Sequence, residues 1–267
     1  MEYRIQHFSR ALVHDALPSL QGGDVGWPIP DFDLPTTDGG RVRKRDFRGT
    51  SPLLVTLACL TSPATASAAP ALRRLHRDYG ERIAFLTVYV RETHPGEKIP
   101  QPPTAEWKLR HAATYRHRDA IPWPVAVDDL EGSFHRAMGG GSGTAFLIDR
   151  SGQVAFRTLW ANDERPLRRA LAALARGAPA IPSVPPRQKP VLPWLRSLVR
   201  VDDVVRAAGG DALRDLRRQT PILYAASELA WIWRTLTPLG RTALAGAASA
   251  LGAAGLVATL RLARHHR

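Results

Sequence analysis

Two residues suited to covalent chemistry lie close together near position 60. Cys59 is the only cysteine of the chain, and Ser62 follows it three residues later, directly before Pro63. A serine followed by a proline is typical of a helix start, where free backbone amides and the helix dipole stabilise an anion such as a thiolate. The pair could supply a thiol or a hydroxyl nucleophile, provided that the chain turns here from a strand into a helix.

The flanking residues predict that turn. Residues 53–57 form an apolar, partly β-branched run, which is typical of a strand buried on both faces. From Pro63 to Gly80 apolar residues recur at helical spacing, and the glycine marks the helix end. Residues 82–94 indicate a second buried strand that ends at His94. A strand, a helix and a strand of these lengths predict a parallel crossover in an α/β protein.

The segment ahead of the first strand carries a family resemblance. It contains Pro-x-Phe-x-Leu at 30–34, the turn dipeptide Asp38-Gly39, and Asp-Phe-Arg-Gly at 46–49. This order resembles the opening of the redoxin branch of the thioredoxin superfamily, which includes peroxiredoxins and alkyl hydroperoxide reductases. The resemblance implies a thioredoxin-like α/β fold, with a central mixed sheet flanked by helices, and an oxidoreductase activity.

A second resemblance covers the strand after the helix. Phe85-Leu-x-Val-Tyr-Val-Arg-Glu-x-His94-Pro is similar to the iodothyronine deiodinase family, whose members place a histidine in this loop near a selenocysteine or cysteine within Thr-Cys-Pro. Thr61-Ser62-Pro63 matches that motif with serine substituted. Together the two patterns cover about residues 23–175.

The same family suggests where the nucleophile belongs. Thioredoxin-like proteins with a Cys-Pro-Pro-Cys type motif often carry a helix proline eight residues after the first cysteine, and eight residues before Pro70 stands Ser62. The motif is then residues 62–65, with both cysteines absent. In a rival register, residues 59–62 form a Cys-x-x-Ser monothiol motif. Gly143 stands where the family usually has a cis-proline facing the catalytic cysteine.

The candidate site therefore comprises Cys59, Ser62 and His94, with Thr61, Pro63 and Gly143 beside them. Ser62 is either a nucleophile activated by His94 or simply the N-cap of the helix. Cys59 is either a working thiol or a buried, inert cysteine. The functional hypotheses are accordingly a thiol oxidoreductase that lacks the usual active-site cysteine, and a catalytically silent binding or scaffolding module tethered to a membrane. Enzymatic activity stays open.

The charge composition limits the classes of binding partner that we expect. The chain holds 37 Lys and Arg against 24 Asp and Glu, and residues 181–267 alone hold 13 against 5. Nucleic-acid binding would call for a basic groove with interleaved aromatic residues, and the sequence shows no such pattern. We therefore expect the basic tail to bind anionic lipid. A redox partner or a small-molecule substrate, of unknown identity, is expected in addition. The histidines show no ligand spacing with carboxylates or thiols, and we expect neither a metal nor a cofactor. A single cysteine excludes an internal disulfide.

Four segments are predicted along the chain. They are an N-terminal arm (1–22), the thioredoxin-like domain (23–178), a proline-rich linker (179–193) and a basic helical tail (194–267) with short helices at 194–208 and 211–218. Within the tail, residues 242–260 are uncharged for 19 residues, which just meets the span of a bilayer core. The polar start is unlike a signal peptide, so we expect the domain at the cytoplasmic face of a membrane, or alternatively soluble in the cytoplasm.

Overall fold

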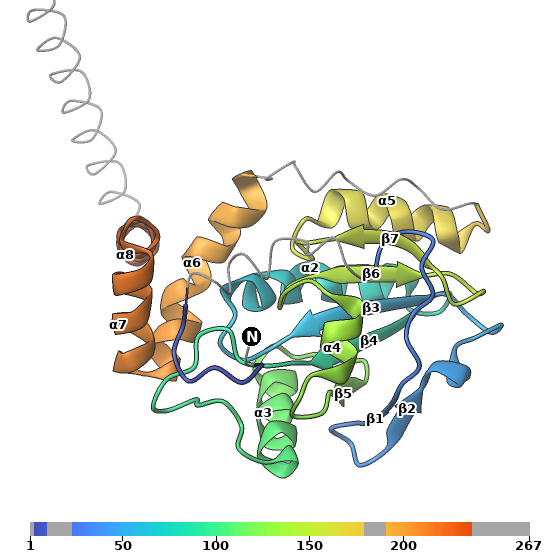
Figure 1. Ribbon diagram of the computed structural model, residues 1–267. Coiled ribbons are helices and arrows are strands. Elements are labelled where there is room, and N and C mark those ends of the chain that lie inside the picture. The colour runs from blue at the N-terminus through green and yellow to red at the C-terminus, as the bar shows by residue number, and fades with distance from the viewer. Residues whose placement is uncertain (1–2, 10–22, 179–190, 237–267) are drawn as a thin grey trace, which may run out of the picture.

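The computed structural model describes residues 3–9, 23–178 and 191–236. A five-stranded sheet of order β5-β4-β3-β6-β7 forms its centre (Figure 1). Its strands are β3 (Leu53–Ala58), β4 (Ala84–Tyr89), β5 (Val125–Val127), β6 (Ala145–Ile148) and β7 (Val154–Thr158). The first three are parallel, and β6 and β7 are antiparallel to their neighbours. The predicted central mixed sheet is confirmed.

The middle strand β3 is buried along its whole length, as its apolar run predicts. Because side chains alternate across a strand, its residues divide between two hydrophobic clusters. Leu54 and Ala58 pack with helices α2 (Pro63–Tyr79) and α5 (Glu164–Ala175). Leu53, Val55 and Leu57 pack with the opposite layer. That layer is made by the hairpin β1 (Asp33–Pro35) and β2 (Arg41–Arg43) and by α4 (Ser133–Met138).

Local sequence signals set the ends of most elements. Asp38-Gly39 turns the β1–β2 hairpin, with Gly39 at a φ of 85° that favours glycine. A short 3-10 helix, η1 (Lys44–Asp46), follows that hairpin. Helix α2 begins after its N-cap Ser62, has Pro63 as its first residue, and ends at Gly80, all as predicted. Helix α3 (Ala105–Arg118) lies beside the β5 edge and is capped by Thr104.

One strand boundary was predicted wrongly. The second buried strand was expected to continue to His94, but β4 ends at Tyr89. Its partner β3 ends at Ala58, whose carbonyl accepts one last hydrogen bond from the Val90 amide at 2.9 Å. Beyond that point no strand remains to pair with, so residues 91–95 leave the sheet as a loop.

Three C-terminal helices follow, namely α6 (Val191–Ala208), α7 (Gly210–Gln219) and α8 (Pro221–Thr235). The helices predicted at 194–208 and 211–218 are thus confirmed, but residues 191–193, expected as the end of the linker, already belong to α6. Pro193 lies in the first turn, where a missing amide hydrogen costs nothing. The rest of the expected linker lies outside the described residues.

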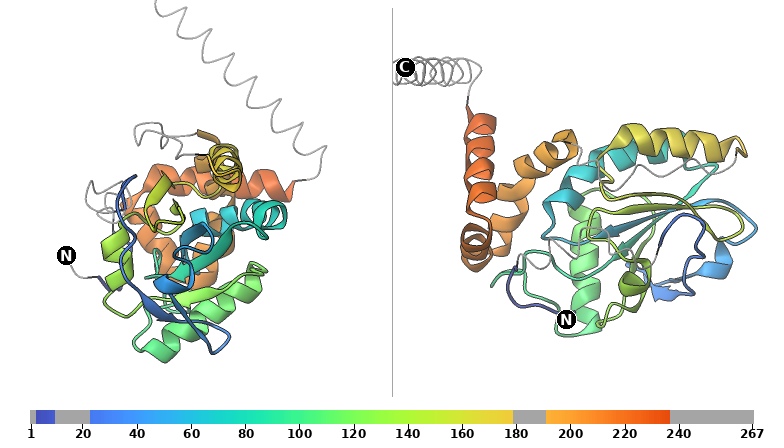
Figure 2. Two further views of the ribbon diagram at one scale, coloured as in Figure 1. Left: turned by 90° about the vertical axis from the view of Figure 1, so that its right-hand side faces the viewer. Right: turned by 45° about the horizontal axis from the view of Figure 1, so that its top comes forward.

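These helices do not stand apart from the α/β domain. Helix α6 packs along α2 and lies between α2 and α8 (Figures 1 and 2). A third hydrophobic cluster joins Phe8 and Ala66 to apolar residues of α6 and α7. Asn162 adds a 2.8 Å hydrogen bond from its Nδ2 to the carbonyl of Pro193. The tail helices are therefore part of the packed structure.

Within the described ranges, no helix combines the length and the apolar character that a membrane crossing requires. The candidate span at 242–260 lies outside the described residues.

Candidate functional site

The site forms where β3 gives way to α2. Ser62 is buried, and its Oγ accepts a 3.3 Å hydrogen bond from the Thr65 amide, as an N-cap does. The same hydroxyl donates to the carbonyl oxygen of Ser142 at 3.4 Å. Both bonds are long, but together they use the hydroxyl as donor and as acceptor within the folded backbone. The N-cap interpretation of Ser62 is confirmed; a role as nucleophile stays a prediction.

Cys59 directly follows the last residue of β3 and is inaccessible to solvent. Its exposed fraction is 0%, and its Sγ lies 3.4 Å from Oγ1 of Thr93 and 3.9 Å from Oγ1 of Thr61. Burial raises the pKa of the Cys59 thiol to about 11, and the negative charge of Glu92 contributes in the same direction. Burial and the nearby charge of Glu92 thus both disfavour the thiolate form of the chain's only thiol.

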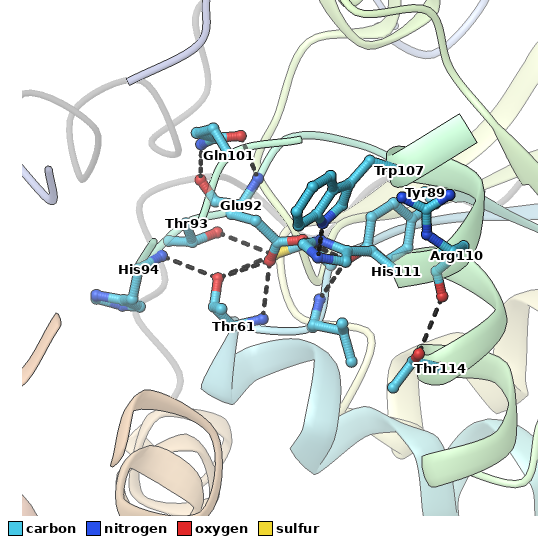
Figure 3. Close-up of polar contacts among 12 residues, drawn as sticks. Thr61, Tyr89, Glu92, Thr93, His94, Gln101, Trp107, Arg110, His111 and Thr114 are labelled. Carbon is cyan, nitrogen blue, oxygen red and sulfur yellow. Dashed lines mark hydrogen bonds and ion pairs between the residues drawn. The ribbon is translucent and has the colours of Figure 1, made fainter. Parts of the chain in front are cut away.

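His94 faces away from the corner. Its backbone amide donates to Thr61 Oγ1 at 3.0 Å, while its ring packs on Phe8 with the ring centroids 4.3 Å apart. Figure 3 shows the ring pointing away from Thr61 and Glu92. Its Nδ1 is buried without a hydrogen-bond partner, and burial lowers its pKa to about 4. Within the described residues no hydrogen bond links His94 to Ser62, so the structure does not form the serine–histidine pair.

Gly143 brings the loop before β6 against the start of α2. Its amide donates to the Leu57 carbonyl at 2.8 Å, and its φ is +103°. A Cβ added at this position would lie only 2.8 Å from Cβ of Ala64. Among the described residues no peptide bond is cis. The position expected for a cis-proline is thus next to the helix start, but glycine is the residue that fits there.

The centre of the polar network is Glu92, which the sequence analysis did not select. Its exposed fraction is 0%, and four donors converge on its carboxylate (Figure 3). Thr61 donates to Oε2 from its amide at 3.1 Å and from its hydroxyl at 2.8 Å. Tyr89 and His111 both contact Oε1, the latter at 3.3 Å. The Gln101 side chain fixes the backbone of Glu92: its Oε1 accepts from the Glu92 amide at 3.1 Å, and its Nε2 donates to the Glu92 carbonyl at 2.7 Å.

Trp107 sets the tautomer of His111. The indole Nε1 can only donate, and it lies 2.9 Å from His111 Nε2, which must therefore accept. The ring proton of a neutral His111 then sits on Nδ1 and points to Glu92. Tyr89 also accepts a 3.1 Å bond from the Leu60 amide, and burial raises its pKa well above the usual value. The network thus runs from the surface at Trp107 to the β3–α2 corner.

Two signals in the sequence were available for this network. Glu92 is a charged residue near the end of the predicted buried strand at 82–94, and Trp107, His111 and Tyr115 recur at intervals of four residues, which places them on one face of α3. Neither signal says that the carboxylate turns inward to meet Thr61, because that depends on packing between two loops. In the described part of the chain, no three His, Cys, Asp or Glu residues are grouped so that they could hold a metal ion.

Comparison with known proteins places the chain in a family. The family model named Redoxin matches residues 24–174, more than half of the chain. The chain belongs to the redoxin family. This redoxin is also 31% identical over 134 residues to the thyroxine 5-deiodinase of Gallus gallus, a match that covers 46% of the chain and 52% of the relative. The chain thus spans about half the length of this relative. The expected thioredoxin-like, redoxin and deiodinase-like similarities are confirmed.

Solved structures are similar to this redoxin at lower sequence identity. A putative thiol:disulfide interchange protein DsbE from Chlorobium tepidum is 23% identical with a TM-score of 0.43, covering 57% of this chain and 98% of that one. Peroxidoxin BcpB from Mycobacterium tuberculosis is 17% identical with a TM-score of 0.42, covering 57% and 96%. A hypothetical protein from Sinorhizobium meliloti 1021 is 19% identical with a TM-score of 0.48, covering 60% and 91%.

Proposed function

We propose that this redoxin is a binding or scaffolding module that does not perform thiol–disulfide exchange at its β3–α2 corner. The observation that carries the proposal is the state of the only thiol. Cys59 is fully buried, and its pKa is raised to about 11. At that value roughly one thiol in ten thousand is ionised at pH 7.

The residue at the helix start supports the same proposal. In our register Ser62 stands for the family's nucleophilic cysteine, and a hydroxyl cannot form the mixed disulfide on which exchange depends. The hydroxyl is bonded to the Thr65 amide and the Ser142 carbonyl, and no hydrogen bond from His94 activates it. The close approach of Gly143 to Ala64 supports the register, because the family's cis-proline loop faces the same helix start.

A thiol oxidoreductase that uses Cys59 is the second candidate. Family membership favours it, and so do the hydroxyls of Thr93 and Thr61 near the sulfur, since hydroxyl donors stabilise a thiolate. For this activity the loop that carries Thr93 would have to open and admit substrate and water to Cys59.

A reduction panel separates the two candidates. The wild type, Cys59→Ser and Ser62→Cys would be assayed with a peroxide, a peptide disulfide and an iodothyronine, with dithiothreitol as the electron donor. The proposal expects no turnover by the wild type above the rate measured without protein. Turnover by the wild type that disappears in Cys59→Ser would overturn it and establish the second candidate.

The proposed module also has a candidate tether. Residues 242–260 carry no charge, and Arg261, Arg264 and Arg267 follow them. As a helix this segment would extend roughly 28 Å, close to the hydrocarbon thickness of about 30 Å. We infer attachment to an anionic membrane through this segment. The full chain should then sediment with membranes and resist carbonate extraction, whereas a chain ending at Leu236 should not. Release of the full chain by salt alone would reduce the tether to a charge-driven contact.

A further inference from the structure

Helix α8 is apolar on two sides. Its inner side packs against α6 and α7 through Leu223, Tyr224 and Ala226. On the outer side Ile222 is 85% exposed and Leu229 is 63% exposed. These two residues are seven apart, with the exposed Ala225 between them, so they line one face of the helix. We call Ile222, Ala225 and Leu229 the outer face of α8.

The charges of α8 are turned inward. Between Pro221 and Thr235 the only charged residues are Glu228 and Arg234. Glu228 lies 3.1 Å from Arg206, and Arg234 lies 2.7 Å from Asp203, and both of these partners belong to α6. The outer face is therefore uncharged as well as apolar. In a water-soluble protein, a surface helix normally places its charged residues on the outward side.

The first turn of α6 carries further exposed apolar side chains. The ion pairs from 228 to 206 and from 234 to 203 show that α8 runs antiparallel to α6, so the last turn of α8 lies beside the middle of α6 and points towards its start. In that first turn Leu192, Trp194 and Leu195 are exposed by 64%, 40% and 44%, and Trp231 of α8 is exposed by 37%. Tryptophan and tyrosine side chains are enriched where a membrane meets water.

The chain beyond α8 identifies what covers this face. Six residues after Leu236 begins the uncharged run 242–260, which ends in a group of three arginines. We propose that the outer face of α8 lies on an anionic phospholipid bilayer, at the boundary between headgroups and acyl chains. This inference rests on the tether of the proposed function and is independent of its catalytic part.

The contact would orient the molecule as well as attach it. An amphipathic contact of this kind buries one helix face at the bilayer boundary while the polar side stays in water. Because α6 lies between α8 and α2, two helix layers, α8 and α6, would separate the bilayer from the β3–α2 corner (Figure 2). The corner would then stay open to partners in the aqueous phase.

Site-specific labels test the contact in the full chain. In a Cys59→Ser background, an environment-sensitive nitrobenzoxadiazole label would be placed at Leu229→Cys, at Ala250→Cys in the tail, and at Ala113→Cys in α3 as the water-facing control. On vesicles of phosphatidylcholine and phosphatidylserine, labels at 229 and 250 should shift to the blue, and the label at 113 should not. A response at 250 without one at 229 would overturn the inference and leave the tether standing. Silence at both positions would overturn both.

A charge substitution gives an independent readout. Leu229→Glu should abolish the blue shift of a label at Ile222→Cys in the Cys59→Ser background, because it places a charge in an apolar contact, while the tether keeps the chain on the vesicle. Ala113→Glu, on an exposed part of α3, should leave that blue shift unchanged. Light scattering without vesicles measures the oligomeric state and so tests whether a second copy of the chain, rather than a bilayer, covers the outer face of α8. A wild-type dimer that Leu229→Glu converts to a monomer would assign the outer face of α8 to a second copy and overturn the proposal.

Discussion

Thr61 donates two hydrogen bonds to the Oε2 atom of Glu92, one from its hydroxyl at 2.8 Å and one from its amide at 3.1 Å. These bonds join the start of α2 to the loop after β4, and the 3.0 Å bond from the His94 amide to the Thr61 hydroxyl reinforces the junction. The shape of the corner therefore depends on a buried carboxylate more than on Ser62 or Cys59.

Replacing Glu92 should destabilise the fold and alter the thiol. In Glu92→Gln the new amide group meets donors where the carboxylate accepted them, at a cost of about 2–4 kcal/mol in the free energy of unfolding. The pKa of Cys59 should fall, since the charge of Glu92 contributes to raising it. Urea unfolding and a thiol titration measure the two effects, with the exposed Glu81→Gln as the control. Unchanged stability would show that the four contacts are replaced by water.

Ser62→Cys in a Cys59→Ser background tests the register. The new sulfur would replace a hydroxyl that accepts the Thr65 amide at the start of a 17-residue helix. Free amides and the helix dipole should hold its pKa below the usual value of about 8.5. The rate of alkylation by iodoacetamide against pH gives the pKa, with Thr114→Cys as an exposed reference. A profile equal to that of the reference would count against the register.

Gly143→Ala should be costly for two reasons that can be separated. The φ of +103° strains any side chain, and the new Cβ would lie 2.8 Å from Ala64 Cβ. We expect a loss of about 2–4 kcal/mol in the free energy of unfolding. Gly39→Ala, with a φ of +85° and no neighbour within 4 Å, should lose only about 1–2 kcal/mol. Adding Ala64→Gly should recover the difference; if it does not, the steric explanation is wrong.

His94 should make the protein sensitive to acid. Burial lowers its folded pKa to about 4, below the unfolded value of about 6.5, so between these values the unfolded state binds more protons. Stability should fall as the pH drops from 6.5 towards 4, by up to about 1.4 kcal/mol per pH unit for this group. His94→Phe keeps a ring against Phe8 and should remove that share of the slope, measured by urea unfolding at several pH values.

The sequence alone was sufficient for elements whose causes lie among neighbouring residues. The apolar run 53–57, the cap at Ser62, the proline after it and Gly80 predicted β3 and α2 with boundaries correct to within one residue. The Asp38-Gly39 turn and the helical spacing at 194–208 worked for the same reason, since dihedral preference and hydrophobic period are local properties. The redoxin resemblance rested on these local patterns and was confirmed over residues 24–174.

Only the tertiary structure decided how the side chains of the site are arranged. The direction of the Glu92 side chain cannot be predicted from neighbouring residues. The carboxylate is buried because Thr61, Gln101 and His111, which are distant along the chain, hydrogen-bond to this residue. One of the two interpretations of Ser62 needed His94 to face it, but the His94 ring packs on Phe8 from the N-terminal segment instead. The packing of α6 on α2 was likewise not foreseen, because an amphipathic pattern shows that a helix buries one face without naming its partner. Loop side chains have no fixed period, so their direction is set by long-range contacts that only the folded chain brings together.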